Sequence, residues 1–327
     1  PTGISTGIFL CFTTNGNYIF SGAVDGVYLS SNNGTNWAQT SLNNDAVYSI
    51  AVSGSTVFAG CGYAFYISTN NGLNWSQGTL NEVSTSLIVS GGNVYSGTYN
   101  GVFVSTNNGS SWTQTSLNNR SVFALAQGTD RMFAGTEGFG VYYTTDNGTT
   151  WIQSSLNSYK VTSLALSGTT VIAGTEADGI YLSNDNGNTW FPKNQGIGNQ
   201  FIMGFYISGS YVFAGTEMNA VWRRNFSEII NIKRITDVIP SGFNLSQNYP
   251  NPFNPVTKIR YEVPVSGNVS ITVFDINGKE VNRIINGMHT PGVYEADFNG
   301  SLLTSGVYFY KLQSGNFSAV KKMVLVK

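Results

Sequence analysis

The sequence predicts an all-β protein: a six-bladed β-propeller followed by a small immunoglobulin-like β-sandwich. An eight-residue phrase of the form S-x-[D/N]-x-G-x-x-W occurs five times, with its tryptophans 37 to 39 residues apart. A second phrase, of which FAGTEGFGVY is typical, occurs six times. After residue 241 the repeats give way to a proline-rich string and alternating strand patterns. A period near 40 residues with short apolar segments is typical of one four-stranded blade per repeat.

The fourth repeat shows how one blade divides into strands. The expected strands A to D are residues 121–127, 131–136, 140–145 and 151–156. Asp146-Asn147-Gly148 supplies a turn that tolerates positive φ, as a tight hairpin requires. Strand A carries a column of small residues, which we expect to face the crowded propeller axis: Cys11, Ser49, Ser86, Ala124, Ser163 and Gly204.

The eight-residue phrase is expected to be structural rather than catalytic. Its Ser/Thr and Asp/Asn side chains can satisfy backbone N–H groups in the turn between strands C and D. Its glycine permits the bend, and its tryptophan covers the hairpin. The residues concerned are Ser30, Asn32, Gly34, Trp37, Ser68, Asn70, Gly72, Trp75, Ser105, Asn107, Gly109, Trp112, Thr144, Asp146, Gly148, Trp151, Ser183, Asp185, Gly187 and Trp190.

These phrases, SSNNGTNW and TTDNGTTW among them, resemble Asp-box repeats, also called bacterial neuraminidase (BNR) repeats. Such repeats occur in sialidases, sortilin-type receptors, xyloglucan hydrolases and photosystem assembly factors, all of them propellers. The resemblance covers about residues 1–226. It implies the fold but not an activity, because these families share the box and not the chemistry.

The sixth copy has no recognisable strand D, so the ring needs an outer strand from elsewhere. Ile4 aligns with a leucine that ends strand D in four other repeats, so residues 1–5 are expected to complete the sixth blade. Residues 226–232 (FSEIINI) compete for the same place. Six blades is the favoured count.

The tail after residue 241 is expected to form a second domain. Four prolines in residues 243–264 exclude a helix there. A hairpin with Asn277-Gly278 at its tip and two alternating strands follow, which predicts a small antiparallel sandwich. The expected domains are therefore a propeller at 1–226, a linker at 227–242 and the tail at 243–327. Four isoleucines suggest that the linker packs against neighbouring structure: Ile229, Ile230, Ile232 and Ile235.

The tail closely resembles the type A C-terminal sorting domain of the type IX secretion system. The strings QNYPNPFNP, FDINGKEV, SGVYFYKL and KKMVLVK carry the resemblance. It implies a bacterium of the Bacteroidota or a related group and recognition of residues 243–327 by the secretion machinery. It also implies an extracellular protein, attached to the outer-membrane surface or released.

Composition narrows the function. Charged residues are only 10% of the 327 and net charge is −1, without the basic cluster that nucleic-acid binding uses. No apolar run reaches the roughly 18 residues of a membrane span. The single histidine, His289, expected in a loop, excludes a catalytic triad in the repeats. We expect no metal and no cofactor, and free thiols at Cys11 and Cys61 are favoured over a disulfide.

Candidate binding residues gather on the face that carries the B–C and D–A loops. They are Tyr63, Tyr99, Phe139, Tyr159, Glu137, Glu176 and Glu217, and the three glutamates occupy equivalent repeat positions. Arg120 is expected beside Glu137, and Lys160 beside Glu176. Exposed aromatic side chains suit sugar stacking or a protein contact. The glutamates could be a glycosidase pair or a cation site, or partly salt-paired copies of one repeat residue.

The favoured function is a secreted, non-catalytic surface protein whose propeller binds a glycan or a protein in adhesion. The alternative is a subunit that assembles with copies of itself into an extracellular filament or surface layer. A glycoside hydrolase ranks third. A sialidase is excluded because the propeller lacks three convergent arginines.

Overall fold

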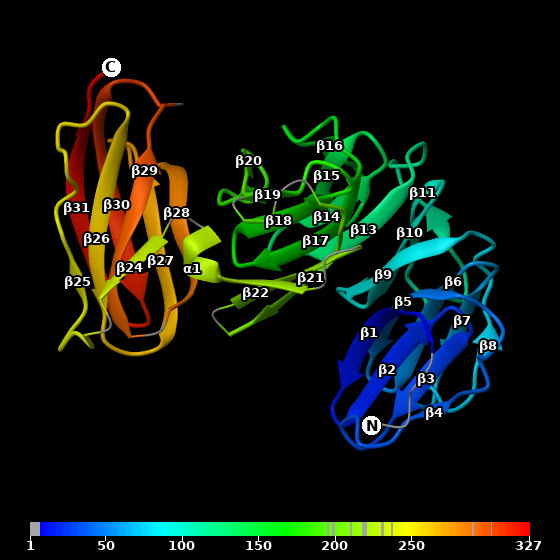
Figure 1. Ribbon diagram of the computed structural model, residues 1–327. Coiled ribbons are helices and arrows are strands. Elements are labelled where there is room, and N and C mark those ends of the chain that lie inside the picture. Colours follow the sequence, from blue (N-terminus) through cyan, green and yellow to red (C-terminus); the bar gives the residue numbers. More distant parts are fainter. Residues whose placement is uncertain are drawn as a thin grey trace. The chain divides into compact units, whose positions relative to one another are not determined.

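The computed structural model describes residues 7–194, 196–197, 200–209, 211–217, 221–229, 232–236, 238–289, 291–301 and 303–327. It confirms the all-β prediction: small antiparallel sheets follow one another along the chain (Figure 1). A four-residue helix, α1 (Phe226–Ile229), is the only helix among the described residues. The chain divides into two compact units, residues 1–164 (unit 1) and 165–327 (unit 2), and each is described by itself.

Unit 1 contains four antiparallel sheets of four strands, and in each sheet the strands lie in chain order. The strands are β1 (Phe9–Asn15), β2 (Tyr18–Ala23), β3 (Gly26–Ser30), β4 (Ala38–Gln39); β5 (Val47–Ser53), β6 (Thr56–Cys61), β7 (Phe65–Ser68), β8 (Ser76–Gln77); β9 (Ser84–Ser90), β10 (Asn93–Thr98), β11 (Gly101–Ser105), β12 (Thr113–Gln114); β13 (Val122–Gln127), β14 (Met132–Thr136), β15 (Gly140–Thr144) and β16 (Ile152–Gln153).

The repeats continue into unit 2 with two more sheets. They are β17 (Val161–Ser167), which begins in unit 1, with β18 (Thr170–Thr175), β19 (Ile180–Ser183) and β20 (Phe191–Pro192), and then β21 (Ile202–Ser208), β22 (Tyr211–Thr216) and β23 (Val221–Asn225). The last sheet has three strands within the described residues. Residues 1–5, with Ile4, lie outside the described residues, so their proposed role as its outer strand stays a prediction.

The competing outer strand at residues 226–232 is wrong. Phe226–Ile229 is helical, and β24 (Ile232–Thr236) pairs with the tail strand β29 (Gly292–Asn299). Ile229 is buried while Ile235 is exposed, so the expected linker packs in part. Phe226 and Ile229 belong to the same buried cluster as Val212 and Ala214 of the last repeat sheet.

The outer strand of each repeat is shorter than expected. The sequence predicts strand D over 151–156, but β16 contains only two residues. The chain still follows β15, because Ser154 N donates to Val141 O at 2.8 Å and Val141 N donates to Leu156 O at 2.8 Å. Ser155 therefore lies between two hydrogen bonds to Val141 and interrupts the regular strand pairing. Apolar periodicity alone predicts an uninterrupted strand here.

Strand A of the repeats carries a bulge at a repeated place. One residue drops out of the pairing with strand B in five sheets: Leu10, Tyr48, Thr85, Phe123 and Met203. The next residue belongs to the small column, where hydroxyls link neighbouring sheets. Ser49 Oγ accepts from Leu87 N at 2.8 Å, and Ser86 Oγ accepts from Leu125 N at 3.0 Å. The serines thus satisfy backbone donors where the bulge interrupts regular pairing.

The core of unit 1 lies between neighbouring sheets rather than in one central mass. Phe20 of β2 shares a buried cluster with Val47 and Ile50 of β5. Phe58 and Phe65 of the second sheet pack against Leu87 and Val94 of the third. Each such aromatic side chain contributes roughly 2 to 3 kcal/mol of burial free energy.

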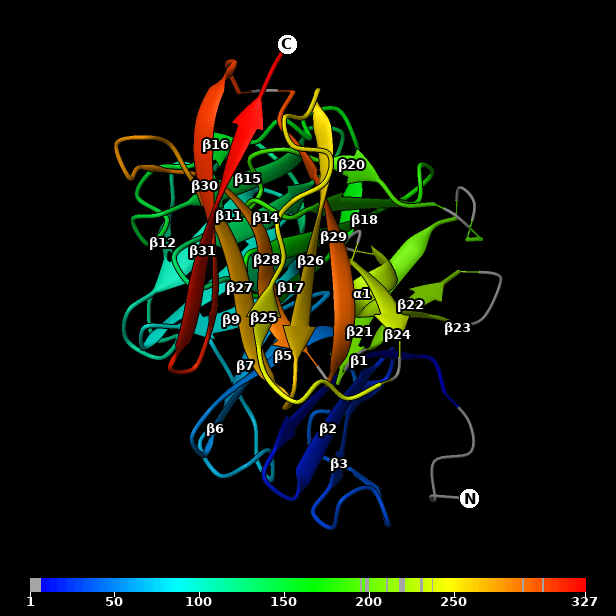
Figure 2. The same cartoon turned by 90° about the vertical axis from the view of Figure 1, so that its left-hand side faces the viewer.

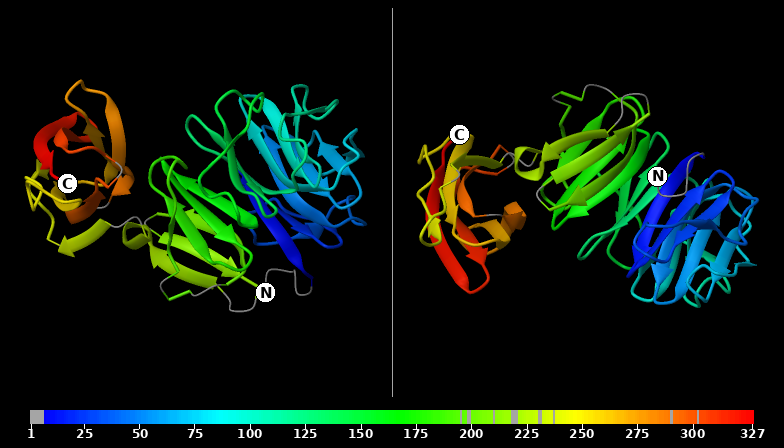
Figure 3. Two further views of the ribbon diagram at one scale, coloured as in Figure 1. Left: turned by 90° about the horizontal axis from the view of Figure 1, so that it is seen from above. Right: turned by 60° about the horizontal axis from the view of Figure 1, so that its bottom comes forward.

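Two four-stranded sheets form the tail, and they face each other across a shared core in the turned views (Figure 2 and Figure 3). One sheet has the order β24-β29-β26-β25 and the other β28-β27-β30-β31. The remaining bounds are β25 (Asn244–Leu245), β26 (Val256–Val263), β27 (Gly267–Phe274), β28 (Glu280–His289), β30 (Gly306–Ser314) and β31 (Phe317–Leu325).

The one histidine and the two cysteines of the chain lie wholly or partly within the protein interior. His289 is not a loop residue: it ends β28, is buried, and its Nε2 lies 2.8 Å from the hydroxyl of the buried Tyr261. Cys11 and Cys61 are free thiols, as favoured from the sequence. Burial raises the pKa of Cys11 to about 12 and raises that of Cys61 further, so neither thiol is a nucleophile near neutral pH.

Candidate functional site

The five eight-residue phrases form the same hydrogen-bonded turn. In the fourth, Thr144 Oγ1 donates to Asp146 Oδ1 at 2.7 Å and accepts from Gly148 N at 3.0 Å. Asp146 Oδ1 also accepts from Thr150 N at 2.9 Å. The residue before the glycine has φ between 55° and 60° in all five copies, where asparagine is tolerated. The polar groups are occupied with one another, so the turn has little left for chemistry.

We predict that Asp146→Asn removes one source of acid sensitivity. The Thr150 hydroxyl, the Thr150 backbone and the Thr144 hydroxyl lower the pKa of Asp146 to about 2. Because the pKa is lowered on folding, its stabilisation is full above pH 4 and disappears as pH falls through about 2. Asparagine occupies this position in the first three copies, so D146N should leave the unfolding midpoint at pH 7 nearly unchanged. Thermal unfolding at pH 2.5, 4 and 7 measures the effect, and parallel pH profiles for both proteins would contradict it.

Six side chains of unit 1 lie on or beside loops that hydrogen bonds tie together, and we call them the loop-surface cluster: Tyr99, Arg120, Phe123, Glu137, Phe139 and Lys160. Their side-chain contacts form two groups, Arg120 with Phe139, and Lys160 with Phe123, Glu137 and, through Phe123, Tyr99. Arg120 Cζ lies 3.8 Å from the centre of the Phe139 ring. Lys160 Nζ lies 4.9 Å from the Phe123 ring centre and 3.7 Å from Glu137 Oε1. The Tyr99 and Phe123 rings meet edge to face at 6.1 Å. Cation–π contacts of this kind contribute about 0.5 to 1 kcal/mol each at exposed sites.

Backbone hydrogen bonds hold the loops beneath this cluster. Glu137 N donates to Ser121 O at 3.0 Å, and Ser121 Oγ donates to Tyr99 O at 3.2 Å. The loop after β14 is also tied to the loop after β16, since Gly140 N donates to Tyr159 O at 2.8 Å. The cluster therefore rests on ordered loops, which suits recognition by a fixed surface.

Tyr63 stands apart from the cluster. Its side chain is 89% exposed, and no ring contact joins it to another aromatic side chain within the described part of the chain. Its backbone N–H donates to Asp45 Oδ2 at 3.3 Å. Asp45 is buried, and its other oxygen has no partner among the described residues. A buried carboxylate thus holds the loop that presents Tyr63.

The structure contradicts one predicted ion pair and shows another that was not predicted. Arg120 was expected beside Glu137, but its guanidinium lies over the Phe139 ring. Lys160, which was expected beside Glu176, pairs with Glu137 of the loop after β14, and its pairing with Glu176 stays a prediction. The expected partner of Arg120 was assigned from repeat position alone. A flat guanidinium can be stabilised by stacking on a neighbouring ring as well as by pairing with a half-exposed carboxylate.

The other candidate residues occupy separate places. Tyr159 is half-buried in unit 1, whereas Glu176 and Glu217 are exposed in unit 2. Glu217 repeats the local backbone of Glu137, since its N–H donates to Phe201 O at 3.2 Å. Among the described residues, no three His, Cys, Asp or Glu side chains gather as metal ligands would.

Sequence reasoning missed Phe123, whose ring contacts both Tyr99 and Lys160. Phe123 lies inside strand A, where an apolar residue is expected to face the core. The bulge at this residue turns its ring toward the loops instead. Its position just before the small column is the only sequence signal, and that signal requires knowledge of the bulge.

In the tail, the QNYPNPFNP string is held by a buried hydrogen-bond network. Asn248 Nδ2 donates to Pro250 O and to Thr257 Oγ1, both at 3.0 Å. The Tyr310 hydroxyl accepts from Asn248 N and donates to Ser246 O, both at 2.8 Å. These contacts fix the segment that leads into β26, so the string has a structural role.

Residues 247–327 match the family described as the secretion system C-terminal sorting domain. The tail is a type IX secretion signal domain. It marks the protein for export to the cell surface or the extracellular space. A comparison with curated proteins finds no match. No described helix combines the length and apolarity that crossing a bilayer demands.

Solved structures that resemble the chain are β-propellers. PorZ, an essential surface component of the type IX secretion system of Porphyromonas gingivalis, matches with a TM-score of 0.58 and 12% identity. The match covers 100% of this chain and 53% of PorZ, so the chain spans about half the length of that protein. YCF48 from Cyanidioschyzon merolae matches with a TM-score of 0.55 and 12% identity over 90% of this chain and 96% of that one.

An ancestral GH74 enzyme matches with a TM-score of 0.58 and 15% identity over 97% of this chain and 59% of its own. At such identities the likeness shows the fold alone. Non-enzymatic and hydrolytic proteins both occur among the similar structures, so activity has to be argued from the residues of this chain.

Proposed function

We propose that this protein is a non-catalytic binding module displayed on the surface of a bacterium of the Bacteroidota or a related group. In this proposal residues 1–226 form a six-bladed propeller of Asp-box repeats, residues 227–242 a linker, and residues 243–327 an immunoglobulin-like sandwich. The loop surface of the propeller binds a glycan or a surface protein in adhesion, and the secretion machinery recognises the tail.

The exposed aromatic side chains above ordered loops carry the proposal. Tyr63 is 89% exposed, Tyr99 50% and Phe139 41%. Rings of this kind offer flat apolar faces with little conformational entropy to lose on binding. Glu137 is the only acid in the loop-surface cluster, and Lys160 pairs with it. A glycosidase needs two carboxyl groups facing one bond, so binding is favoured over hydrolysis.

The test is binding of the full chain to a glycan array and to isolated outer-membrane proteins. The double variant Tyr63→Ala/Tyr99→Ala should lose roughly tenfold in affinity, because two stacking contacts contribute about 0.5 to 1.5 kcal/mol each. Tyr249→Ala is the matched control, since Tyr249 is 80% exposed in the tail. Equal binding by the double variant and the control would reject the loop surface as the site.

Self-assembly is the second candidate, and the sheet β21-β22-β23 favours it. Val221 and Trp222 are exposed on β23, which is an edge strand of this sheet among the described residues. An apolar edge strand can pair with another copy of the chain. Sedimentation over a concentration series separates the candidates: a species of constant single-chain mass supports the binding module, and growth into open-ended species supports the assembly.

A further inference from the structure

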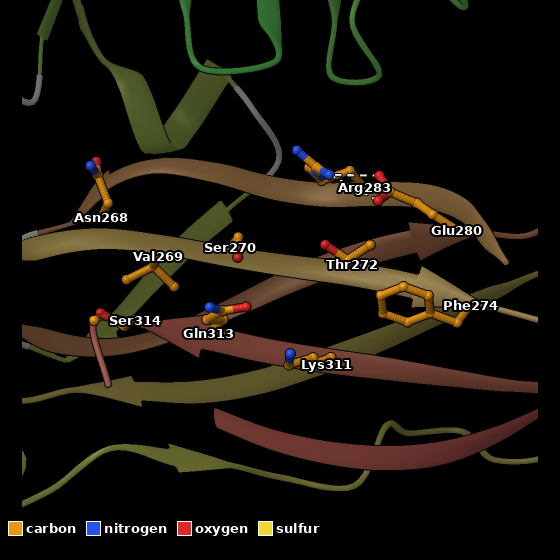
Figure 4. A pocket seen from close by; sticks show the side chains of 11 residues that line it. Asn268, Val269, Ser270, Thr272, Phe274, Glu280, Arg283, Lys311, Gln313 and Ser314 are labelled. Carbon is orange, nitrogen blue, oxygen red and sulfur yellow. Dashed lines mark hydrogen bonds and ion pairs between the residues drawn. The ribbon is translucent and has the colours of Figure 1, made fainter. Parts of the chain in front are cut away.

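The outer face of the tail sheet β28-β27-β30 is hollowed into a cavity of about 450 Å³. Its size falls within the roughly 300 to 1,000 Å³ of ordinary ligand sites. Figure 4 shows the cavity running along β27, from Asn268 and Ser314 at one end to Phe274 and Glu280 at the other. The cavity belongs to the tail and is independent of the loop surface.

The strand register explains both the hollow and its lining. Thr272 lies opposite Arg283 of β28 on one side and Lys311 of β30 on the other. The pairing of β27 with β28 shifts at Thr272 and again at Phe274. Such bulges bend and twist a sheet and re-aim side chains. Alternation along β27 places Ile271 and Val273 in the core, whereas Ser270, Thr272 and Phe274 line the cavity.

Four of the polar side chains that line the cavity make no side-chain hydrogen bond or ion pair within the described residues. Thr272 is only 7% exposed, yet its hydroxyl has no hydrogen-bond partner among the described residues. The side chains of Ser270, Lys311 and Gln313 likewise make no hydrogen bond or ion pair within the described chain. Thr272 is buried, Ser270 and Lys311 are half-buried, and Gln313 is exposed, so polar groups at several depths along one groove are available to a ligand.

The charge of the cavity selects an anionic ligand. Arg283 is neutralised by Glu280, through contacts of 3.0 Å from Nε and 2.8 Å from Nη2. Lys311 has no such counter-ion within the described residues, so these three groups leave one positive charge. Lys311 is half-buried, and a lower local dielectric strengthens the attraction between its ammonium group and a carboxylate.

The sheet also selects between classes of anionic chain. β27 is a central strand that pairs with both β28 and β30 over residues 270–274, so a peptide cannot join it there through backbone hydrogen bonds. Recognition has to use side chains: hydroxyls and an amide as hydrogen-bonding groups, the Phe274 ring as a stacking face, and Lys311 for a charge. We propose that this cavity binds an acidic polysaccharide, with a uronic acid carboxylate at Lys311.

Binding of the full chain to polygalacturonate, with neutral dextran of similar length as comparison, tests this proposal. We expect polygalacturonate alone to bind, and more weakly as salt is raised. Lys311→Gln should weaken binding at least fivefold, and Thr272→Val at least threefold. Lys321→Gln is the matched control, because Lys321 is exposed on β31 and does not line the cavity.

Several outcomes would overturn the proposal. Equal binding of dextran would remove the charge argument, and equal affinities for K311Q and K321Q would place the site elsewhere. Competition by poly-glutamate as strong as that by polygalacturonate would replace the saccharide with an acidic peptide. T272V retains shape and charge, so its unfolding midpoint and affinity together separate loss of ligand contacts from loss of fold.

Discussion

Gly140→Ala is expected to destabilise unit 1 by about 3 kcal/mol or more, which for its length corresponds to roughly 6 to 12 °C in the unfolding midpoint. Gly140 has φ +69°, a conformation that costs an alanine about 1 to 2 kcal/mol. A Cβ at this residue would also overlap the carbonyl oxygen of Leu156, far inside van der Waals contact. The overlap involves backbone, so no side-chain rotation relieves it. Calorimetry of the full chain measures the shift.

Gly138→Ala separates the two contributions. Gly138 lies two residues away with φ +75°, and an added Cβ would meet nothing within 4 Å. G138A should therefore show only the conformational cost, about 1 to 2 kcal/mol. If both variants lost the same stability, the close approach of Leu156 would contribute nothing and the turn would be limited by φ alone.

The close contact between a glycine and a leucine carbonyl also explains why the repeat could be recognised in the sequence. Gly26 and Gly101 meet the carbonyl oxygens of Leu42 and Leu117 as Gly140 meets that of Leu156. A recurring glycine at the start of strand C and a recurring leucine after the short strand D are thus the two partners of one contact. Periodic contacts of this kind predict the sheets of each repeat and three of the four strands in the parsed copy.

Features that depend on irregular pairing were not predictable. The two-residue β16 and the bulge at Phe123 both break the alternation that sequence analysis assumes. As a result, the candidate aromatic residues were found in the loops, while the ring that links Tyr99 to Lys160 was not. The partner of Arg120 was missed for a related reason, because distance between loops is set by tertiary packing and not by repeat position.

The tail cavity illustrates the same limit. Ser270, Thr272 and Phe274 alternate with apolar residues, which predicts an ordinary solvent-facing strand surface. Only the paired register of three strands brings Arg283 and Lys311 to either side of Thr272. The QNYPNPFNP string identified the tail as a sorting domain for secretion. The residues of the candidate ligand site lie outside that string, so the string did not predict the site.

That string leads to the second large expected effect. Asn248→Ala should destabilise the tail by about 3 kcal/mol, because it removes buried hydrogen bonds and leaves a cavity. Asn248 is 2% exposed, and its amide contacts Pro250 O, Thr257 Oγ1 and Gln247 Nε2. Amide hydrogen exchange resolves the tail from the rest of the chain. Its protected amides should exchange about 100-fold faster in N248A.

Two other asparagines in the string provide graded controls. Asn251 is exposed, but its Oδ1 accepts from Val324 N at 2.9 Å, so N251A should cost about 1 kcal/mol. Asn254 is exposed and makes no side-chain hydrogen bond within the described residues, so N254A should change little. The order N248A, N251A, N254A follows burial and bonding alone. If the three variants exchanged alike, the string would owe its place in the tail to recognition by the secretion machinery rather than to the fold.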